Sequence, residues 1–143
     1  MYASVADMVA RFGETEMIRL SRPEDRTAET VLAAKVELAL ADATGLIDDY
    51  LRARYAVPVA APPDSVVRAA CVLARYDLAK GERTEPTEQM RLDRKEVIAW
   101  LTAIAEGVAD IGAPAAGVGS DGASGARASD RPEIFDDRGL RYW

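Results

Sequence analysis

The chain has 143 residues, of which 49% are hydrophobic and 29% are charged, as is typical of one globular domain with a single modest core. Its net charge is −6 and it has no cluster of five or more Lys and Arg residues, so tight binding of DNA or RNA is not expected. Histidine is absent and cysteine occurs once, which removes the usual general base and the commonest metal ligands. The composition therefore predicts no enzyme, no cofactor and no metal site.

Two further absences concern location. No apolar run approaches the ~20 residues that cross a bilayer, and the start of the chain, MYASVADM, does not resemble a signal peptide. We therefore expect no membrane contact and assembly in the cytosol. The single cysteine, Cys71, lies in the apolar run VVRAACVLA, which favours a small core residue over a reactive thiol.

The first half of the chain predicts three helices. Ser4 and Asp7 have the spacing of a capping box at the start of the first helix, and Gly13 suits its end. A second, short helix is predicted over about 15–20, followed by a polar loop. The third and longest is predicted over 31–58, about seven turns, ending in a proline-rich loop. Its apolar stripe contains Val36, Leu40, Ala43, Ile47 and Tyr50, with Leu32 and Leu51 at the two ends.

The second half predicts two more helices, over about 64–80 and about 87–106. No alternation of β-branched residues persists, so the fold is predicted to be all-α, a small bundle of four to five helices around one long central helix. Residues 1–111 form the predicted helical domain. Residues 112–130, built from Gly, Ala, Ser and Asp, predict a flexible linker, and 131–143 form the end of a C-terminal arm.

The last segment, RPEIFDDRGLRYW, is unusual because terminal residues are normally polar. An apolar, aromatic tip on a mobile linker predicts a docking peptide, and the alternative is that the tip folds back onto its own domain. The candidate docking residues are Arg131, Pro132, Ile134, Phe135, Leu140, Tyr142 and Trp143.

Two sequence patterns could indicate a binding or catalytic site, but for both a purely structural explanation is favoured. Residues 117–122 match the dinucleotide-binding pattern GxGxxG, but the required strand before it and helix after it are missing. Asp48 and Asp49 are adjacent carboxylates, yet successive helix positions point about 100° apart, so a solvated helix face is favoured over shared ion or proton binding.

The end of the long helix carries two arginines and two tyrosines. Arg52 and Arg54 are predicted in its last turn, where they complement the negative end of the helix dipole, and either could also bridge to a neighbouring subunit. For Tyr50 and Tyr55, packing in the core is favoured over a ligand site.

Several blocks of the chain, in order, resemble the phage head-completion or head–tail adaptor proteins related to Mu-type gp36. These blocks are MYASVADMVARFGETEMIRL, IDDYLRARYAVPV, VVRAACVLARYDLAKG, VIAWLTAIAEG and the ending RPEIFDDRGLRYW. The resemblance implies a structural virion protein without catalysis, located in the neck between capsid and tail and assembled in the host cytoplasm.

The same resemblance implies the partners. About twelve copies would form a ring under the portal protein, extend the DNA channel and offer a platform for the stopper or tail-completion protein. Double-stranded DNA would pass through the lumen without specific binding, which suits an acidic surface. The C-terminal segment would dock on the portal, and Tyr50, Arg52, Arg54, Tyr55 and Pro58 would form a structural corner and part of the ring interface.

Two other functions remain open at this point. The first is a non-viral helical adaptor or regulator that binds a protein partner through its aromatic tail, which neighbouring genes for capsid, portal or tail proteins would exclude. The second is a small nucleic-acid-binding helical protein, which a gel-shift titration at low salt would test.

Overall fold

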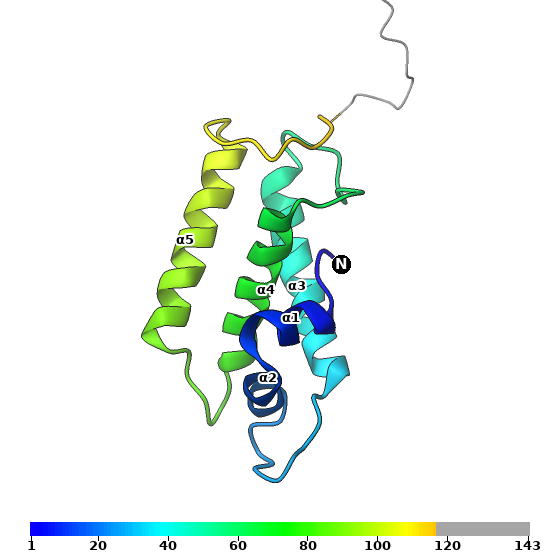
Figure 1. The fold of residues 1–143 in the computed structure, drawn as a ribbon. Coiled ribbons are helices and arrows are strands. Elements are labelled where there is room, and N and C mark those ends of the chain that lie inside the picture. The colour runs from blue at the N-terminus through cyan, green and yellow to red at the C-terminus, as the bar shows by residue number, and fades with distance from the viewer. Residues whose placement is uncertain (117–143) are drawn as a thin grey trace, which may run out of the picture.

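The computed structural model describes residues 1–116, and the rest of the chain lies outside the described residues. The described part has five α-helices and no strand, which confirms the predicted all-α bundle. The helices are α1 (Val5–Phe12), α2 (Glu14–Ser21), α3 (Ala33–Leu51), α4 (Asp64–Ala79) and α5 (Glu88–Ala105). Figure 1 shows α3, α4 and α5 side by side with alternating directions, while α1 and α2 pack against α3 and α4. No helix within residues 1–116 is long and apolar enough to span a membrane.

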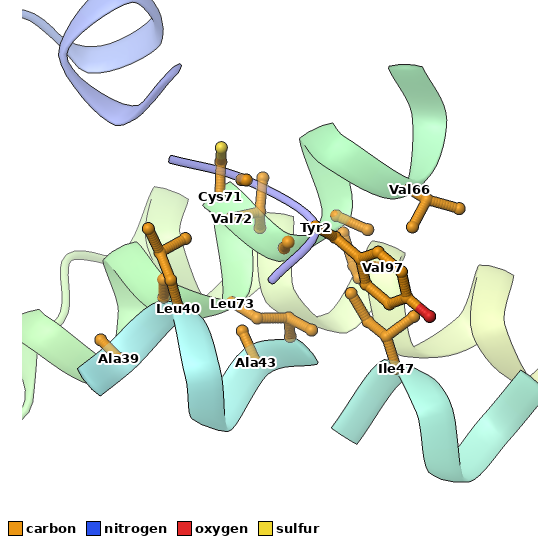
Figure 2. Close-up of a cluster of buried hydrophobic side chains, with 14 of the residues drawn as sticks. Tyr2, Ala39, Leu40, Ala43, Ile47, Val66, Cys71, Val72, Leu73 and Val97 are labelled. Atoms are coloured by element: carbon orange, nitrogen blue, oxygen red, sulfur yellow. The ribbon is translucent and has the colours of Figure 1, made fainter. Parts of the chain in front are cut away.

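The centre of the bundle is α4, although α3 is the longest helix. Nine of the 16 residues of α4 are buried, and α4 contacts α3, α5 and the two short helices. Figure 2 labels four of the nine in the core. The nine are Val66, Ala69, Ala70, Cys71, Val72, Leu73, Ala74, Leu78 and Ala79. The alanines among them let neighbouring helices approach on several sides, because interhelical distance depends on side-chain size at the contact. In α3 only one face is buried: Val36, Ala39, Leu40, Ala43, Ile47 and Leu51.

Helix starts follow the local sequence where a capping side chain is present. The Ser4 hydroxyl accepts the Asp7 N–H at 3.2 Å and the Asp7 carboxylate accepts the Ser4 N–H at 2.7 Å, which confirms the predicted capping box. The Ser4 hydroxyl also donates to the Asp7 carboxylate at 2.7 Å, and this bond, together with the one from the Ser4 N–H, lowers the pKa of Asp7 below its ordinary value. At α5 the Thr87 hydroxyl accepts the Met90 N–H at 3.2 Å.

The prediction of one helix over 31–58 was wrong at both ends, because α3 spans only Ala33–Leu51. At its start Leu32 has a non-helical backbone, and its N–H donates to the buried Ser21 hydroxyl at 3.0 Å, which ties the start of α3 to α2. At its end the N–H groups of Arg54 and Tyr55 both donate to the Leu51 carbonyl, at 2.9 Å each, in a tight turn. Tertiary contacts of the residues beyond Leu51 therefore end the helix earlier than its apolar spacing predicts.

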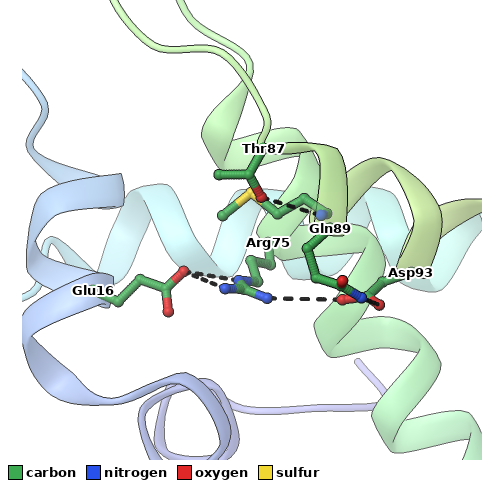
Figure 3. Close-up of polar contacts among 6 residues, drawn as sticks. Glu16, Arg75, Thr87, Gln89 and Asp93 are labelled. Carbon is green, nitrogen blue, oxygen red and sulfur yellow. Dashed lines mark hydrogen bonds and ion pairs between the residues drawn. The ribbon is translucent and has the colours of Figure 1, made fainter.

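One arginine of α4 joins the short helices to the last helix (Figure 3). The Arg75 guanidinium donates to the Glu16 carboxylate of α2 at 2.6 and 2.9 Å and lies 4.0 Å from the Asp93 carboxylate of α5. It also stacks on the Phe12 ring of α1, 4.5 Å from the ring centroid. A half-buried cation with these neighbours fixes where α1 and α2 sit on the bundle.

Candidate functional site

The candidate site begins in the turn after α3, and we call residues 52–59 the corner. Arg54 of the corner extends to α5, where its Nη1 donates to the carbonyl oxygens of Ile104 at 2.8 Å and Ala109 at 2.9 Å. The last carbonyls of a helix have no partner within the helix and lie at the negative end of its dipole. Arg54 therefore caps the C-terminal end of α5, about fifty residues away in sequence.

The segment after α5, residues 107–116, folds back along the corner, and we call it the strap. It starts at Gly107, whose φ of +83° ends the helix in a conformation that favours glycine. The Tyr55 hydroxyl donates to the Asp110 carboxylate at 3.0 Å and accepts the Ile111 N–H at 3.4 Å. Bonds from the Gly112 N–H and from Tyr55 lower the pKa of Asp110 below its ordinary value.

Backbone hydrogen bonds continue this contact to the end of the described chain. The Ala56 N–H donates to the Pro114 carbonyl at 3.2 Å, and the Ala116 N–H donates to the Arg54 carbonyl at 2.9 Å. The first five residues of the predicted linker, 112–116, therefore lie against the helical domain. The corner thus fixes the point from which the remaining C-terminal residues continue.

The N-terminus meets the corner from another side through Tyr2, which is 5% exposed. Its hydroxyl donates to the Asp48 carboxylate and accepts the Val59 N–H at 3.0 Å, and its own N–H donates to the Thr44 hydroxyl at 3.2 Å. Burial, assisted by the bond to Asp48, raises the pKa of Tyr2 to about 12. The predicted solvated face holds for the exposed Asp49 and only in part for Asp48, which is half-buried and accepts the bond from the Tyr2 hydroxyl.

The five predicted corner residues differ in how far they are exposed. Tyr55 is 4% exposed and belongs to the core, as predicted, while Tyr50 is half-buried in the last turn of α3. Arg52 and Pro58 are exposed, and the peptide bond before Pro58 is cis. Arg52 pairs with Asp49 at 3.3 Å on the surface.

The structure corrects the role predicted for the two arginines. Arg52 and Arg54 lie beyond the last residue of α3, so neither is in its last turn. Arg54 acts on the C-terminal end of α5 instead, because the turn at Leu51 directs its side chain across the end of the bundle.

Sequence reasoning missed Tyr2 and Asp110, the two residues that bind the corner from the chain ends. Apolar periodicity carries no signal for either one, since both lie outside helices. Asp110-Ile-Gly112 does have the spacing of a side-chain-to-backbone turn, and the Gly112 N–H donates to the Asp110 carboxylate at 2.6 Å. That local pattern could have predicted an ordered turn after α5.

The structure offers no metal site within residues 1–116, where no group of three or more His, Cys, Asp or Glu side chains converges. The GxGxxG pattern over 117–122 and the predicted docking residues Arg131–Trp143 lie outside the described residues.

Cys71 is fully buried in the described structure, which confirms the predicted core position. Burial raises the pKa of its thiol to about 11, so at pH 8 roughly one molecule in a thousand carries the thiolate. We expect no reaction with a disulfide reagent such as DTNB at pH 8 in the folded chain, and one thiol per chain after denaturation. Absorbance at 412 nm measures both, and rapid labelling of the folded chain would contradict the buried position.

Comparison with known proteins identifies a family whose model matches most of the chain. The family model described as "Bacteriophage Mu, Gp36" matches residues 2–129, which leaves the segment 131–143 outside the match. "Gene product J" of Escherichia phage Mu is 35% identical over 111 residues, covering 78% of this chain and 76% of that protein. "Mu-like prophage FluMu protein gp36" of Haemophilus influenzae is 33% identical over 113 residues, with coverage of 78% and 76%. These findings confirm the resemblance to the Mu gp36 family over the matched residues, while the resemblance of the ending 131–143 stays a prediction.

Proposed function

Since the chain belongs to the Bacteriophage Mu Gp36 family, we propose that it is a structural protein of the virion, the adaptor that joins the head to the tail. In this proposal about twelve copies form a ring beneath the portal protein, in the neck of the particle. The ring extends the DNA channel, receives the stopper or tail-completion protein, and catalyses no reaction. Copies are made in the host cytoplasm and join the particle there.

The observation that carries this proposal is the junction of corner and strap. An adaptor must hold its partner-binding segment at a defined place, and the bonds from Arg54 and Tyr55 hold residues 107–116 against the end of the bundle. The segment 131–143 would then dock on the portal through its apolar and aromatic side chains.

Exposure divides the corner residues between two roles in the ring. Arg52 and Pro58 are exposed and are free to contact a neighbouring copy. Arg54 and Tyr55 bind strap residues of their own chain, so their part is to position the strap. An acidic chain with net charge −6 also suits a channel wall along which DNA slides without being held.

The test removes the docking segment. We expect a chain lacking residues 131–143 to keep its helical circular dichroism spectrum and to lose binding to purified portal protein of the same phage. The reason is that the deleted residues contain the apolar tip and none of the described core. Co-sedimentation or surface plasmon resonance with assembled portal measures the loss, which we expect to exceed about tenfold in Kd, or about 1.4 kcal/mol.

Two matched variants make this test specific. A chain in which Phe135, Tyr142 and Trp143 are replaced by alanine should bind portal as weakly as the deletion. A chain with the order of residues 118–130 scrambled should bind like the wild type, because a linker acts through its length and composition. Wild-type affinity in the deletion variant would reject docking through this segment.

A further inference from the structure

A cavity of about 640 Å³ lies at the end of the bundle opposite the corner, between α2, the loop that follows it and the loop after α4. Its wall combines three cationic and three apolar residues with a threonine from the second loop. The cationic residues are Arg19, Arg22 and Arg26, and the apolar ones are Ile18, Pro23 and Ala28. Such a wall can receive an acidic group and an adjacent apolar side chain together.

Two buried polar atoms in this region have no partner. Across residues 1–116, only Arg22 Nε and Thr84 Oγ1 are buried side-chain polar atoms without a hydrogen bond, and both residues line this cavity. Leaving such a group unsatisfied costs about 1–3 kcal/mol, so native structures contain few of them. Both atoms are covered by neighbouring protein atoms, so an acceptor in the cavity would bond to them only after the Arg22 and Thr84 side chains rearrange.

Within residues 1–116 the cations of the cavity are not held in ion pairs, although Arg22 is near enough to the Asp25 carboxylate for the two charges to interact. None of its three arginines takes part in an ion pair within the described residues. The one carboxylate on the wall, Asp25, accepts the N–H and the hydroxyl of Thr27 at 2.9 and 2.7 Å. The cavity therefore presents guanidinium groups with free hydrogen-bonding capacity.

A carboxylate of a peptide fits this wall better than a phosphate of DNA. Guanidinium groups bind either oxyanion in a two-point geometry. The apolar part of the wall, however, offers nothing to a phosphate backbone, and the net charge of −6 opposes a long polyanion. The occupant we expect is an extended peptide in which an aromatic or aliphatic residue precedes an acidic one.

The chain itself contains such a peptide, Glu133-Ile-Phe-Asp-Asp137. We propose that this segment binds in the cavity, with the carboxylates of Asp136 and Asp137 on the arginines and the Phe135 ring against the apolar wall. The proposal concerns the isolated chain and does not rest on the virion role.

The residues between Ala116 and Glu133 are enough for the segment to reach the cavity. Ala116 is fixed beside the C-terminal end of α3, whereas the cavity lies near its N-terminal end, and 19 helical residues span about 28 Å. Residues 117–132 can extend to roughly 50 Å at about 3.3 Å per residue. Tethering also gives the segment an effective concentration on the order of millimolar, so a weak site is occupied.

Limited trypsin digestion of the full chain tests the proposal. All variants, the reference chain included, carry Arg127→Gln, because trypsin would otherwise cut the linker after Arg127 and untether the segment. The cleavage rate after Arg138 then reports the released fraction. Each rate is divided by the rate for the free peptide 128–143 with the same residues at 136 and 137, because carboxylates beside the cut bond slow trypsin by themselves. On that scale we expect Arg22→Gln and the double variant D136N/D137N each to be cleaved on the order of tenfold faster than the wild type. A variant with all three substitutions should be cleaved no faster than Arg22→Gln or D136N/D137N, because these two variants remove the same contact. Thr84→Val should also accelerate cleavage, by a smaller factor.

The control is Arg68→Gln, an exposed arginine of α4 outside the cavity, which should leave the cleavage rate unchanged. Circular dichroism spectra establish that every variant is folded. Equal cleavage rates in the wild type, Arg22→Gln and D136N/D137N would overturn the proposal. It would also be overturned if Arg22→Gln weakened a gel-shift complex with duplex DNA while leaving cleavage unchanged, since the cavity would then serve phosphates. Portal binding is a separate measurement, so either proposal can fail alone.

Discussion

Replacing Arg54 by alanine should lower the free energy of unfolding by about 1.5–3 kcal/mol, the range for hydrogen bonds that involve a charged group. The substitution removes both bonds from the guanidinium to the carbonyls of Ile104 and Ala109, and the Ile104 carbonyl keeps the bond from the Gly107 N–H at 3.1 Å. The strap loses one of its contacts with the corner and keeps those of Tyr55 and the backbone. Urea denaturation measures the loss of stability, and hydrogen exchange over residues 107–116 should rise more than exchange in α4.

The control for this result is Arg52→Ala. Arg52 is two residues away, is 68% exposed in its side chain and pairs only with the equally exposed Asp49. Exposed ion pairs contribute about 0–1 kcal/mol, so this variant should unfold within about 0.5 kcal/mol of the wild type. Equal losses for the two variants would mean that Arg54 does not hold the strap.

Replacing Tyr2 by phenylalanine should cost about 1–3 kcal/mol, the penalty for leaving buried polar groups without a partner. The ring still fills its place in the core, but the Val59 N–H and the Asp48 carboxylate lose the hydroxyl between them. Tyr50→Phe is the matched control, because the Tyr50 hydroxyl makes no hydrogen bond within the described residues and its ring is only half-buried.

The same tyrosine predicts how stability depends on alkaline pH. The pKa of Tyr2 is raised to about 12 in the folded chain, against about 10 for an exposed tyrosine. The protonated hydroxyl therefore stabilises the fold fully below pH 10, and this contribution is lost as the pH rises towards 12. We expect a loss of about 2–3 kcal/mol over that interval in the wild type and a smaller one in Tyr2→Phe. Parallel pH curves for the two proteins would contradict the coupling.

Much of the fold follows from local signals in the sequence. Apolar spacing found all five helices, and the Ser4–Asp7 capping box defined the first helix start. Helix ends were less predictable where distant residues decide them. Leu32 leaves the helical conformation, and its N–H donates to Ser21. The turn after Leu51 brings Arg54 and Tyr55 to hydrogen-bond partners that lie about fifty residues later in the chain.

The candidate site was predictable only in part. The tyrosines and arginines after α3 stood out by their type, but their partners Asp110 and Tyr2 lie outside helices, where apolar spacing carries no signal. The role of Arg54 at the end of α5 depends on helix arrangement, which a sequence pattern does not contain. Arg75, which joins α2 to α5, was missed for the same reason.

The contacts of the corner also set an order of events during synthesis on the ribosome. Tyr2, Asp48 and Val59 are all available once the first sixty residues have emerged, so the N-terminal contact of the corner can form early. Arg54 and Tyr55 must wait until Ile104, Ala109 and Asp110 have been made, which takes several seconds at about 5–20 residues per second. The strap therefore closes last. Its closure holds residues 107–116 in place and fixes where the C-terminal segment begins. The corner is therefore complete only after all five helices of the described chain have been synthesised.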